Sequence, residues 1–229
     1  MRRKLTLALL VVFVISLIGI PAQAKKAGEI NDDVYTDTEY NFSFSIPAGW
    51  STNVGKAGKV LRVNLDQTSA VPPRHFQGDL RDYMQIPTIK VVVDTTSLTV
   101  EKFIDYLLDP EVKTKQKKGL MKYLPLISKD HEILKRSNVT FAGTKATMLE
   151  ARQAYSMEVS ARGSDRADVV NDYKYGSIFF TVRDGRVYIF HMICEYQTSG
   201  PLIDIFNTMV SSLKFEGAGA EGEAKDSSG

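Results

Sequence analysis

The chain has 229 residues, with 29 Lys and Arg residues against 27 Asp and Glu residues and a formal net charge of +2. Without the first 24 residues, which carry three of the cations, 26 basic residues face 27 acidic ones. Such a balance gives no reason to expect a nucleic acid or an anionic membrane as the partner. Cys194 is the only cysteine, which excludes an intramolecular disulfide, so an apolar core must stabilise the fold.

The N-terminus has the pattern of a secretory signal peptide. Arg2, Arg3 and Lys4 precede an apolar run from Leu5 to Ile20, and Ala22-Gln23-Ala24 supplies an A-x-A cleavage site. The run would span about 24 Å as a helix, which is less than the ~30 Å hydrocarbon core of a bilayer. We therefore expect cleavage after Ala24, export to the periplasm, cell surface or outside, and no stable membrane insertion afterwards. An uncleaved leader that anchors the domain is the alternative.

Composition divides the remainder into one domain and two flanking segments. Residues 25–34 are polar and predicted to form a flexible linker, and residues 217–229 are rich in glycine and predicted to form a disordered tail. Neither segment has enough apolar surface to offset the entropy of ordering it. Residues 35–216 are predicted to form a single domain.

Strand patterns dominate the first half of this domain. Apolar residues alternate with polar ones from Tyr40 to Ile46, and Pro47-Ala48-Gly49 ends this strand before Trp50, which is expected in the core. Lys59 to Asp66 alternates in the same way, and Ile89 to Val93 is a more continuous apolar strand.

The clearest local prediction is a hairpin around Asp184-Gly185. A two-residue turn of this type needs positive φ at both central residues and fixes the pairing of its arms. Phe179 should therefore face Phe190. Because both faces of the two arms are apolar, the hairpin is expected at the centre of the sheet and covered on both sides.

Two amphipathic helices are predicted to cover the sheet. Thr99 caps a helix whose apolar residues recur at helical spacing from Val100 to Leu108. The last helix starts at Ser199, with Pro201 in its first turn. The lysines between Lys113 and Lys122 indicate a solvated helix face. The fold class is therefore predicted as α+β, an antiparallel β-sheet with helices on both faces.

The sequence contains no recognisable catalytic motif. His191 and Cys194 stand three residues apart on a predicted strand, so their side chains point to opposite faces and cannot form a local dyad. We expect a hydrogen-bonded core histidine and a buried thiol. Asp165, Asp168 and Asp172 lie in a segment, 160–174, that is predicted to be a solvated loop.

The long loop 67–85 is the predicted binding surface, because binding groups concentrate on long loops carried by a rigid sheet. Its candidate partner-binding residues are Arg74, His75, Phe76, Asp79, Arg81 and Tyr83. Weak candidates for metal ligands are His75, Asp79 and Asp82, although their spacing matches no known metal-binding loop.

Three features resemble the PsbP-like and Mog1-like domains. They are the strand that closes with Pro-x-Gly-Trp at Trp50, the hairpin from Gly176 to Glu195, and the terminal helix followed by Ser211-Ser-Leu-Lys-Phe215. The resemblance covers roughly residues 35–216 and implies an α/β/α sandwich. It also implies an accessory or binding module and not an enzyme, although no binding motif of the family can be matched residue by residue.

These observations predict an exported, soluble, non-enzymatic accessory protein of the bacterial envelope that needs no cofactor. Its expected partner is an envelope or extracellular protein. The alternative is a metal-dependent enzyme or metal-binding module that uses the 67–85 loop.

Overall fold

The computed structural model describes residues 25–68, 86–128, 130–141, 144–160 and 167–216. The predicted signal peptide, the predicted tail and most of the predicted binding loop lie outside these residues. No helix in the described ranges combines the length and the apolar content that a membrane span requires.

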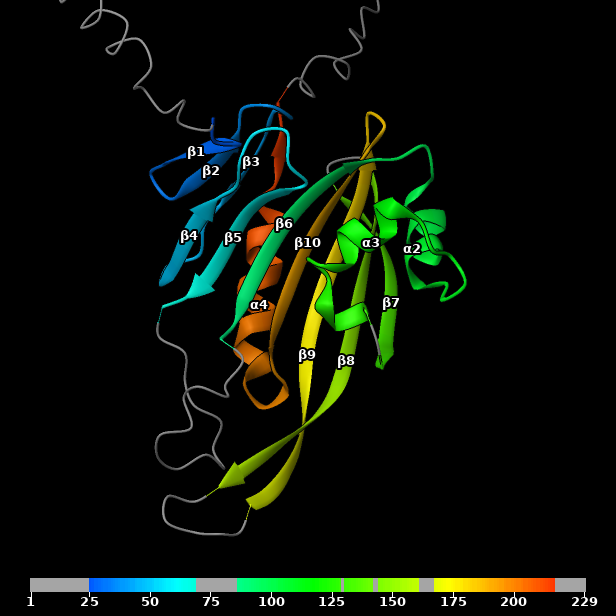
Figure 1. Cartoon of the computed structure of the whole chain (residues 1–229). Coiled ribbons are helices and arrows are strands. Elements are labelled where there is room, and N and C mark those ends of the chain that lie inside the picture. Colours follow the sequence, from blue (N-terminus) through cyan, green and yellow to red (C-terminus); the bar gives the residue numbers. More distant parts are fainter. Residues whose placement is uncertain (1–24, 69–85, 129, 142–143, 161–166, 217–229) are drawn as a thin grey trace, which may run out of the picture.

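A seven-stranded antiparallel sheet forms the centre of the molecule, in the order β4-β5-β6-β10-β9-β8-β7 (Figure 1). Its strands are β4 (Trp50–Val54), β5 (Leu61–Gln67), β6 (Thr88–Thr95), β7 (His131–Phe141), β8 (Thr144–Ser160), β9 (Ala167–Arg183) and β10 (Arg186–Glu195).

The predicted central hairpin is confirmed. Asp184 and Gly185 both have positive φ, and Phe179 pairs with Phe190 as expected. β9 and β10 lie inside the sheet, flanked by β8 and β6.

A second, four-stranded sheet in the order β1-β2-β3-β11 was not predicted. Its strands are β1 (Gly28–Asn31), β2 (Val34–Asp37), β3 (Phe42–Ser45) and β11 (Lys214–Phe215). The prediction of a flexible linker over 25–34 is therefore wrong. Asp32 and Asp33 both take positive φ in the turn between β1 and β2, a conformation that aspartate tolerates better than most residues, and Ala27 is fully buried.

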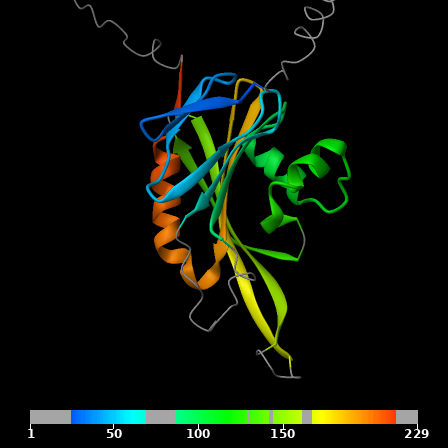
Figure 2. The same ribbon diagram turned by 60° about the vertical axis from the view of Figure 1, so that its left-hand side comes forward.

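Helices lie on both faces of the large sheet, which confirms the predicted fold class (Figure 2). Helix α4 (Ser199–Ser211) and the small sheet cover one face, where Phe42 meets Tyr188 and Phe44 meets Phe190 edge to face. The opposite face carries α2 (Val100–Leu108), α3 (Lys115–Met121) and the 3₁₀ helix η2 (Pro125–Ile127). Thr99 caps α2 as predicted, its side chain accepting a hydrogen bond from the Lys102 amide. A further 3₁₀ helix, η3 (Tyr196–Thr198), precedes α4.

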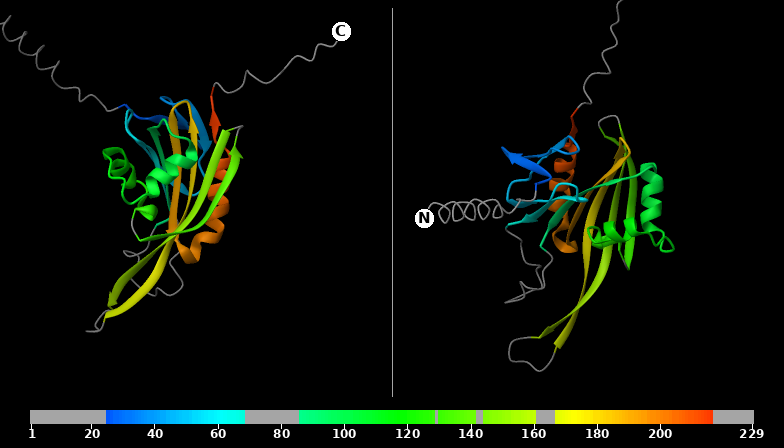
Figure 3. Two further views of the ribbon diagram at one scale, coloured as in Figure 1. Left: turned by 90° about the vertical axis from the view of Figure 1, so that its right-hand side faces the viewer. Right: turned by 45° about the horizontal axis from the view of Figure 1, so that its top comes forward.

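β8 and β9 extend beyond the rest of the sheet as a two-stranded arm (Figure 3). β7 pairs with β8 up to Gln153, and β10 pairs with β9 from Lys174, so residues 154–160 and 167–173 pair with each other. The prediction of a loop over 160–174 is wrong for its second part, because β9 already begins at Ala167.

Candidate functional site

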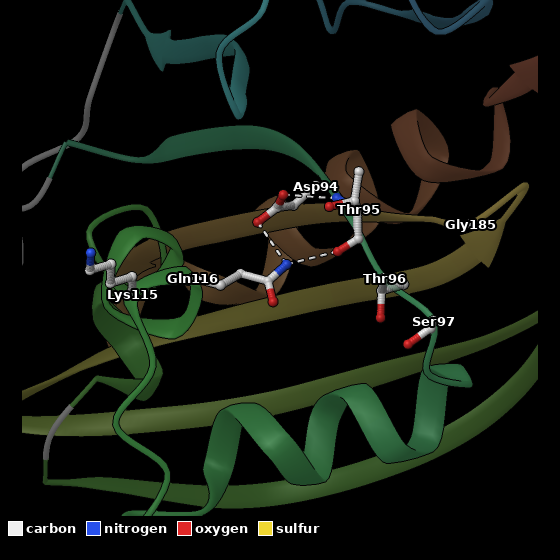
Figure 4. A pocket seen from close by; sticks show the side chains of 7 residues that line it. All are labelled: Asp94, Thr95, Thr96, Ser97, Lys115, Gln116 and Gly185. Carbon is white, nitrogen blue, oxygen red and sulfur yellow. Dashed lines mark hydrogen bonds between the residues drawn. The ribbon is translucent and has the colours of Figure 1, made fainter.

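A polar groove lies where β6 ends, between that strand and α3 (Figure 4). Its volume is about 710 Å³, within the range of ligand-binding pockets. Residues from β6, from the segment after it, from α3 and from the β9–β10 turn line this β6 groove: Asp94, Thr95, Thr96, Ser97, Lys115, Gln116 and Gly185.

The groove exists because β6 extends beyond the point where its pairing with β5 ends. The Val93 amide donates to the Val60 carbonyl, and no described residue of β5 pairs with β6 beyond this point. On the other side, β6 stays paired with β10, and the Thr96 amide donates to the Gly185 carbonyl. The main chain of Thr95 therefore faces the groove, because successive residues of a strand direct their main-chain groups to opposite sides.

Side chains satisfy the main-chain groups of Thr95. Its amide donates to Asp94 Oδ1 over 2.8 Å, and its carbonyl accepts from Gln116 Nε2 over 2.7 Å. The same Gln116 nitrogen lies 3.2 Å from Asp94 Oδ2. The carboxylate and the carboxamide thus occupy the position that the main chain of a further strand would take.

α3 places Gln116 in the groove. Thr114 caps this helix by accepting a hydrogen bond from the Lys117 amide, and buried Leu120 packs the helix onto the sheet. The cap is itself held by a hydrogen bond between its hydroxyl and the Tyr106 hydroxyl of α2.

The groove is polar, and the lysine-rich helix α3 forms one of its walls. Lys113, Lys115 and Lys118 are exposed on α3 or directly before it, and the carboxylate of Asp94 is already hydrogen-bonded. The seven lining residues include no histidine or cysteine, and hydroxyl and amide groups predominate. Such a lining suits hydrogen bonding to a polar ligand better than acid–base or nucleophilic chemistry.

A second hollow of about 340 Å³ adjoins the groove at Ser97. The first turn of α2, the start of β8 and Val182 of β9 line it. The β6 groove therefore continues at Ser97 into a hollow that is partly lined by apolar side chains, those of Leu98, Val100 and Val182.

The binding residues predicted from the sequence lie outside the described residues. These are Arg74, His75, Phe76, Asp79, Arg81, Asp82 and Tyr83. The ends of that loop are described: the Gln67 amide donates to the Pro87 carbonyl, and the Thr88 hydroxyl donates to Asp66 Oδ1. The loop thus enters and leaves at the start of β6, whereas the groove lies at its end, roughly 25 Å away at ~3.3 Å per residue.

The metal-binding alternative stays a prediction, because its residues belong to the same loop. Among the described residues, no group of three or more His, Cys, Asp or Glu side chains could hold a metal ion.

His191 and Cys194 are both fully buried in β10, as predicted. Burial raises the pKa of the Cys194 thiol to about 12, with a smaller contribution from Glu195. The predicted hydrogen bond of His191 is wrong: neither ring nitrogen has a partner in the described part of the chain. Burial, and to a lesser extent the charge of Lys90, lowers the pKa of His191 to about 3.

Buried carboxylates at the base of the arm were missed by the sequence analysis. Asp172 was predicted to be solvated, but it is only 7% exposed and accepts a hydrogen bond from Gln197. Glu195 accepts one from the Tyr155 hydroxyl over 2.7 Å. Burial and this carboxylate raise the pKa of Tyr155. These contacts join the arm to the segment before α4, which is why the aspartate is not on the surface.

The groove residues were missed as well. Gln116 stands among lysines that the sequence assigns to a solvated face, and Asp94 is the last residue but one of β6 and belongs to no motif. No periodicity could reveal them, because their roles depend on a contact between a helix and a strand end.

Solved structures with a similar fold include PsbP-like and Mog1-like proteins. Cyanobacterial PsbP of Synechocystis sp. PCC 6803 matches with a TM-score of 0.41 at 15% identity, over 86% of this chain and 97% of that one. LpqN, which is involved in cell envelope biogenesis of Mycobacterium tuberculosis, matches with a TM-score of 0.43 at 13% identity, over 76% and 82%. The Ran-binding protein Mog1p of Saccharomyces cerevisiae matches with a TM-score of 0.43 at 9% identity, over 82% and 96%.

No protein-family model and no curated protein matches the sequence. The resemblance to PsbP-like and Mog1-like domains is thus found again at the level of the fold. At these identities, the likeness concerns the fold alone.

Proposed function

We propose that this chain is an exported accessory protein of the bacterial envelope that binds another envelope or extracellular protein and catalyses no reaction. The β6 groove is its contact site. The leader pattern of residues 1–24 supports export.

The observation that carries the proposal is the pair of hydrogen bonds on Thr95. Two side chains, Asp94 and Gln116, satisfy its main-chain groups in an open groove of about 710 Å³. A ligand that brings its own hydrogen-bonding groups can exchange with these side chains at little net cost, because each bond lost is replaced by another. A protein partner supplies such groups.

Site-specific photo-crosslinking in the cell tests this proposal. A photoreactive phenylalanine analogue replaces Ser97, which lines the groove and is exposed, and the matched control replaces Asn53, which is exposed on the edge strand β4. One reproducible protein adduct is expected from position 97 and none from position 53. The same adducts from both positions, or none from position 97, would contradict the proposed contact site.

The same analogue at Phe76 tests the surface predicted from the sequence. An adduct from position 76, with none from position 97, would move the contact site to the loop 67–85. Sequencing the N-terminus of the native protein tests export separately, because cleavage after Ala24 leaves Lys25 as the first residue.

A further inference from the structure

We propose that the β6 groove takes an extended, acidic polypeptide segment, which adds to the edge of β6 as a strand and displaces the Gln116 side chain. This inference rests on the proposed function and specifies how the partner binds. Addition of a strand to a sheet edge is a recurrent mode of peptide recognition, in which main-chain hydrogen bonds supply the affinity.

The geometry at Thr95 is that of an unfilled strand position. In an antiparallel pair, one residue exchanges both its amide and its carbonyl bond with the residue opposite. Thr95 offers one such pair of groups, and Asp94 and Gln116 now hold them through a carboxylate and a carboxamide. A peptide residue presents the same donor and acceptor on one backbone, so it can replace both side chains together.

The Gln116 side chain can move out of the groove without disturbing the fold. Its side chain is exposed and belongs to the first turn of α3, whereas the buried anchor of that helix is Leu120. The described bonds of its amide go to Asp94 and Thr95, the two residues that an incoming strand would meet first.

The charge of the α3 wall favours an acidic segment. Lys115 lines one wall of the groove, and Lys113 and Lys118 are exposed directly before α3 and within it. Asp94 is the one carboxylate among the seven lining residues, and it already accepts two hydrogen bonds. Glutamate or aspartate side chains of the partner can pair with these three lysines, which outnumber the single carboxylate of Asp94, and binding should weaken as salt is added.

Position 95 offers a matched pair of variants. Thr95→Pro removes the amide that faces the groove, and no ladder bond to β10 is lost because the neighbouring Thr96 makes that bond. Thr95→Ala removes the side-chain hydroxyl and keeps the amide. Circular dichroism and the melting temperature of both variants check that they fold.

The probes are fluorescent hexapeptides in which valine alternates with glutamate, lysine or serine, and binding is measured by fluorescence anisotropy. We expect the glutamate peptide to bind most tightly. Its affinity should fall about tenfold with Thr95→Pro or when alternate peptide amides are N-methylated, because one or two hydrogen bonds are lost. Thr95→Ala should change it less than about twofold, and Gln116→Ala should leave it unchanged or tighten it.

Three results would overturn strand addition: no binding by any of the hexapeptides, equal binding of the N-methylated peptide, or loss of binding in Gln116→Ala. The crosslinking experiment keeps the two proposals apart. Adducts from position 97 without peptide binding would leave the proposed function standing and reject strand addition. Peptide binding without adducts from position 97 in the cell would reject the β6 groove as the contact site of the proposed function and leave the binding mode.

Discussion

Arg62 and Asp37 form a fully buried ion pair that joins the two sheets. Arg62 Nε donates to Asp37 Oδ2 over 2.7 Å and Nη2 donates to Oδ1 over 3.1 Å, and both side chains are inaccessible to solvent. The remaining donors of Arg62 reach the Lys59 carbonyl and Glu39, while the Tyr35 hydroxyl donates to Asp37. Because β2 supplies the carboxylate and β5 supplies the guanidinium, the pair fixes the small sheet against the large one.

Removing one partner of this pair should be strongly destabilising. Asp37→Ala leaves a buried guanidinium without its main counter-ion, and we expect the free energy of unfolding to fall by about 3–5 kcal/mol. Urea unfolding followed by the fluorescence of Trp50, the only tryptophan, measures it. The control is Glu39→Gln. The Glu39 side chain is 35% exposed, and its replacement should lower the free energy of unfolding by less than about 1 kcal/mol. Equal losses in the two variants would show that burial of the pair does not set its contribution.

His191 should make the protein sensitive to acid. Its pKa is lowered to about 3 in the folded state by burial and by Lys90, against 6.5 when unfolded. The unfolded chain therefore binds a proton between these values while the folded chain does not, so stability falls as the pH drops from about 6.5 towards 3, by up to about 1.4 kcal/mol per pH unit.

Urea titrations of the wild type and His191→Leu at pH 7, 5.5 and 4.5 test this. Carboxylates titrate in both proteins, so the difference between the two curves isolates the histidine. We expect the wild type to lose more stability than the variant over this range. If the stabilities of the two proteins fell in parallel with pH, His191 would be gaining its proton in the folded protein.

Two glycines should respond to alanine in opposite directions. A Cβ at Gly176 would lie 2.2 Å from the Met192 carbonyl oxygen and 2.5 Å from Leu126 Cδ2, so β10 and η2 would have to move. We expect Gly176→Ala to lower the melting temperature sharply. At Gly119 in α3, a Cβ meets no atom within 4 Å, and Gly119→Ala should stabilise by about 0.5–1 kcal/mol. Differential scanning calorimetry compares the two, and a harmless Gly176→Ala would contradict the packing of η2 on β9.

Local signals predicted most of the large sheet and its helices. The Asp184-Gly185 turn fixes the register of its arms through its own backbone geometry, so Phe179 could be paired with Phe190 without any tertiary information. α2 follows equally from helical spacing and the Thr99 cap.

The features that the sequence did not predict depend on contacts between distant segments. β11 pairs Lys214 with Ser43, far away in the sequence, and this pairing completes a second sheet. β1 is polar and lacks alternation, and it is ordered by pairing with β2 instead of by its own pattern. The β6 groove likewise depends on where β5 stops pairing and on where α3 packs, and neither boundary has a signature in the sequence.

Cys194 should be inert in the folded protein. Burial raises the pKa of its thiol to about 12 and removes it from solvent, and the thiolate is the reactive form. An aromatic disulfide reagent at pH 8 should therefore release no detectable chromophore from the native protein and one equivalent after unfolding in guanidinium chloride. Rapid reaction of the native protein would contradict the burial of β10 at this position.

A metal titration decides the alternative based on the loop 67–85. If His75, Asp79 and Asp82 hold a metal, saturation at 100 times the dissociation constant would stabilise the folded state by about 2.7 kcal/mol. In a protein of this size, this would raise the melting temperature by roughly 5–10 °C. For an accessory protein without a cofactor, we expect no shift with calcium, manganese or zinc. The matched variants are His75→Ala and Asp79→Asn: a shift that both variants abolish would establish the metal site, and a shift that survives in both would place the ion elsewhere.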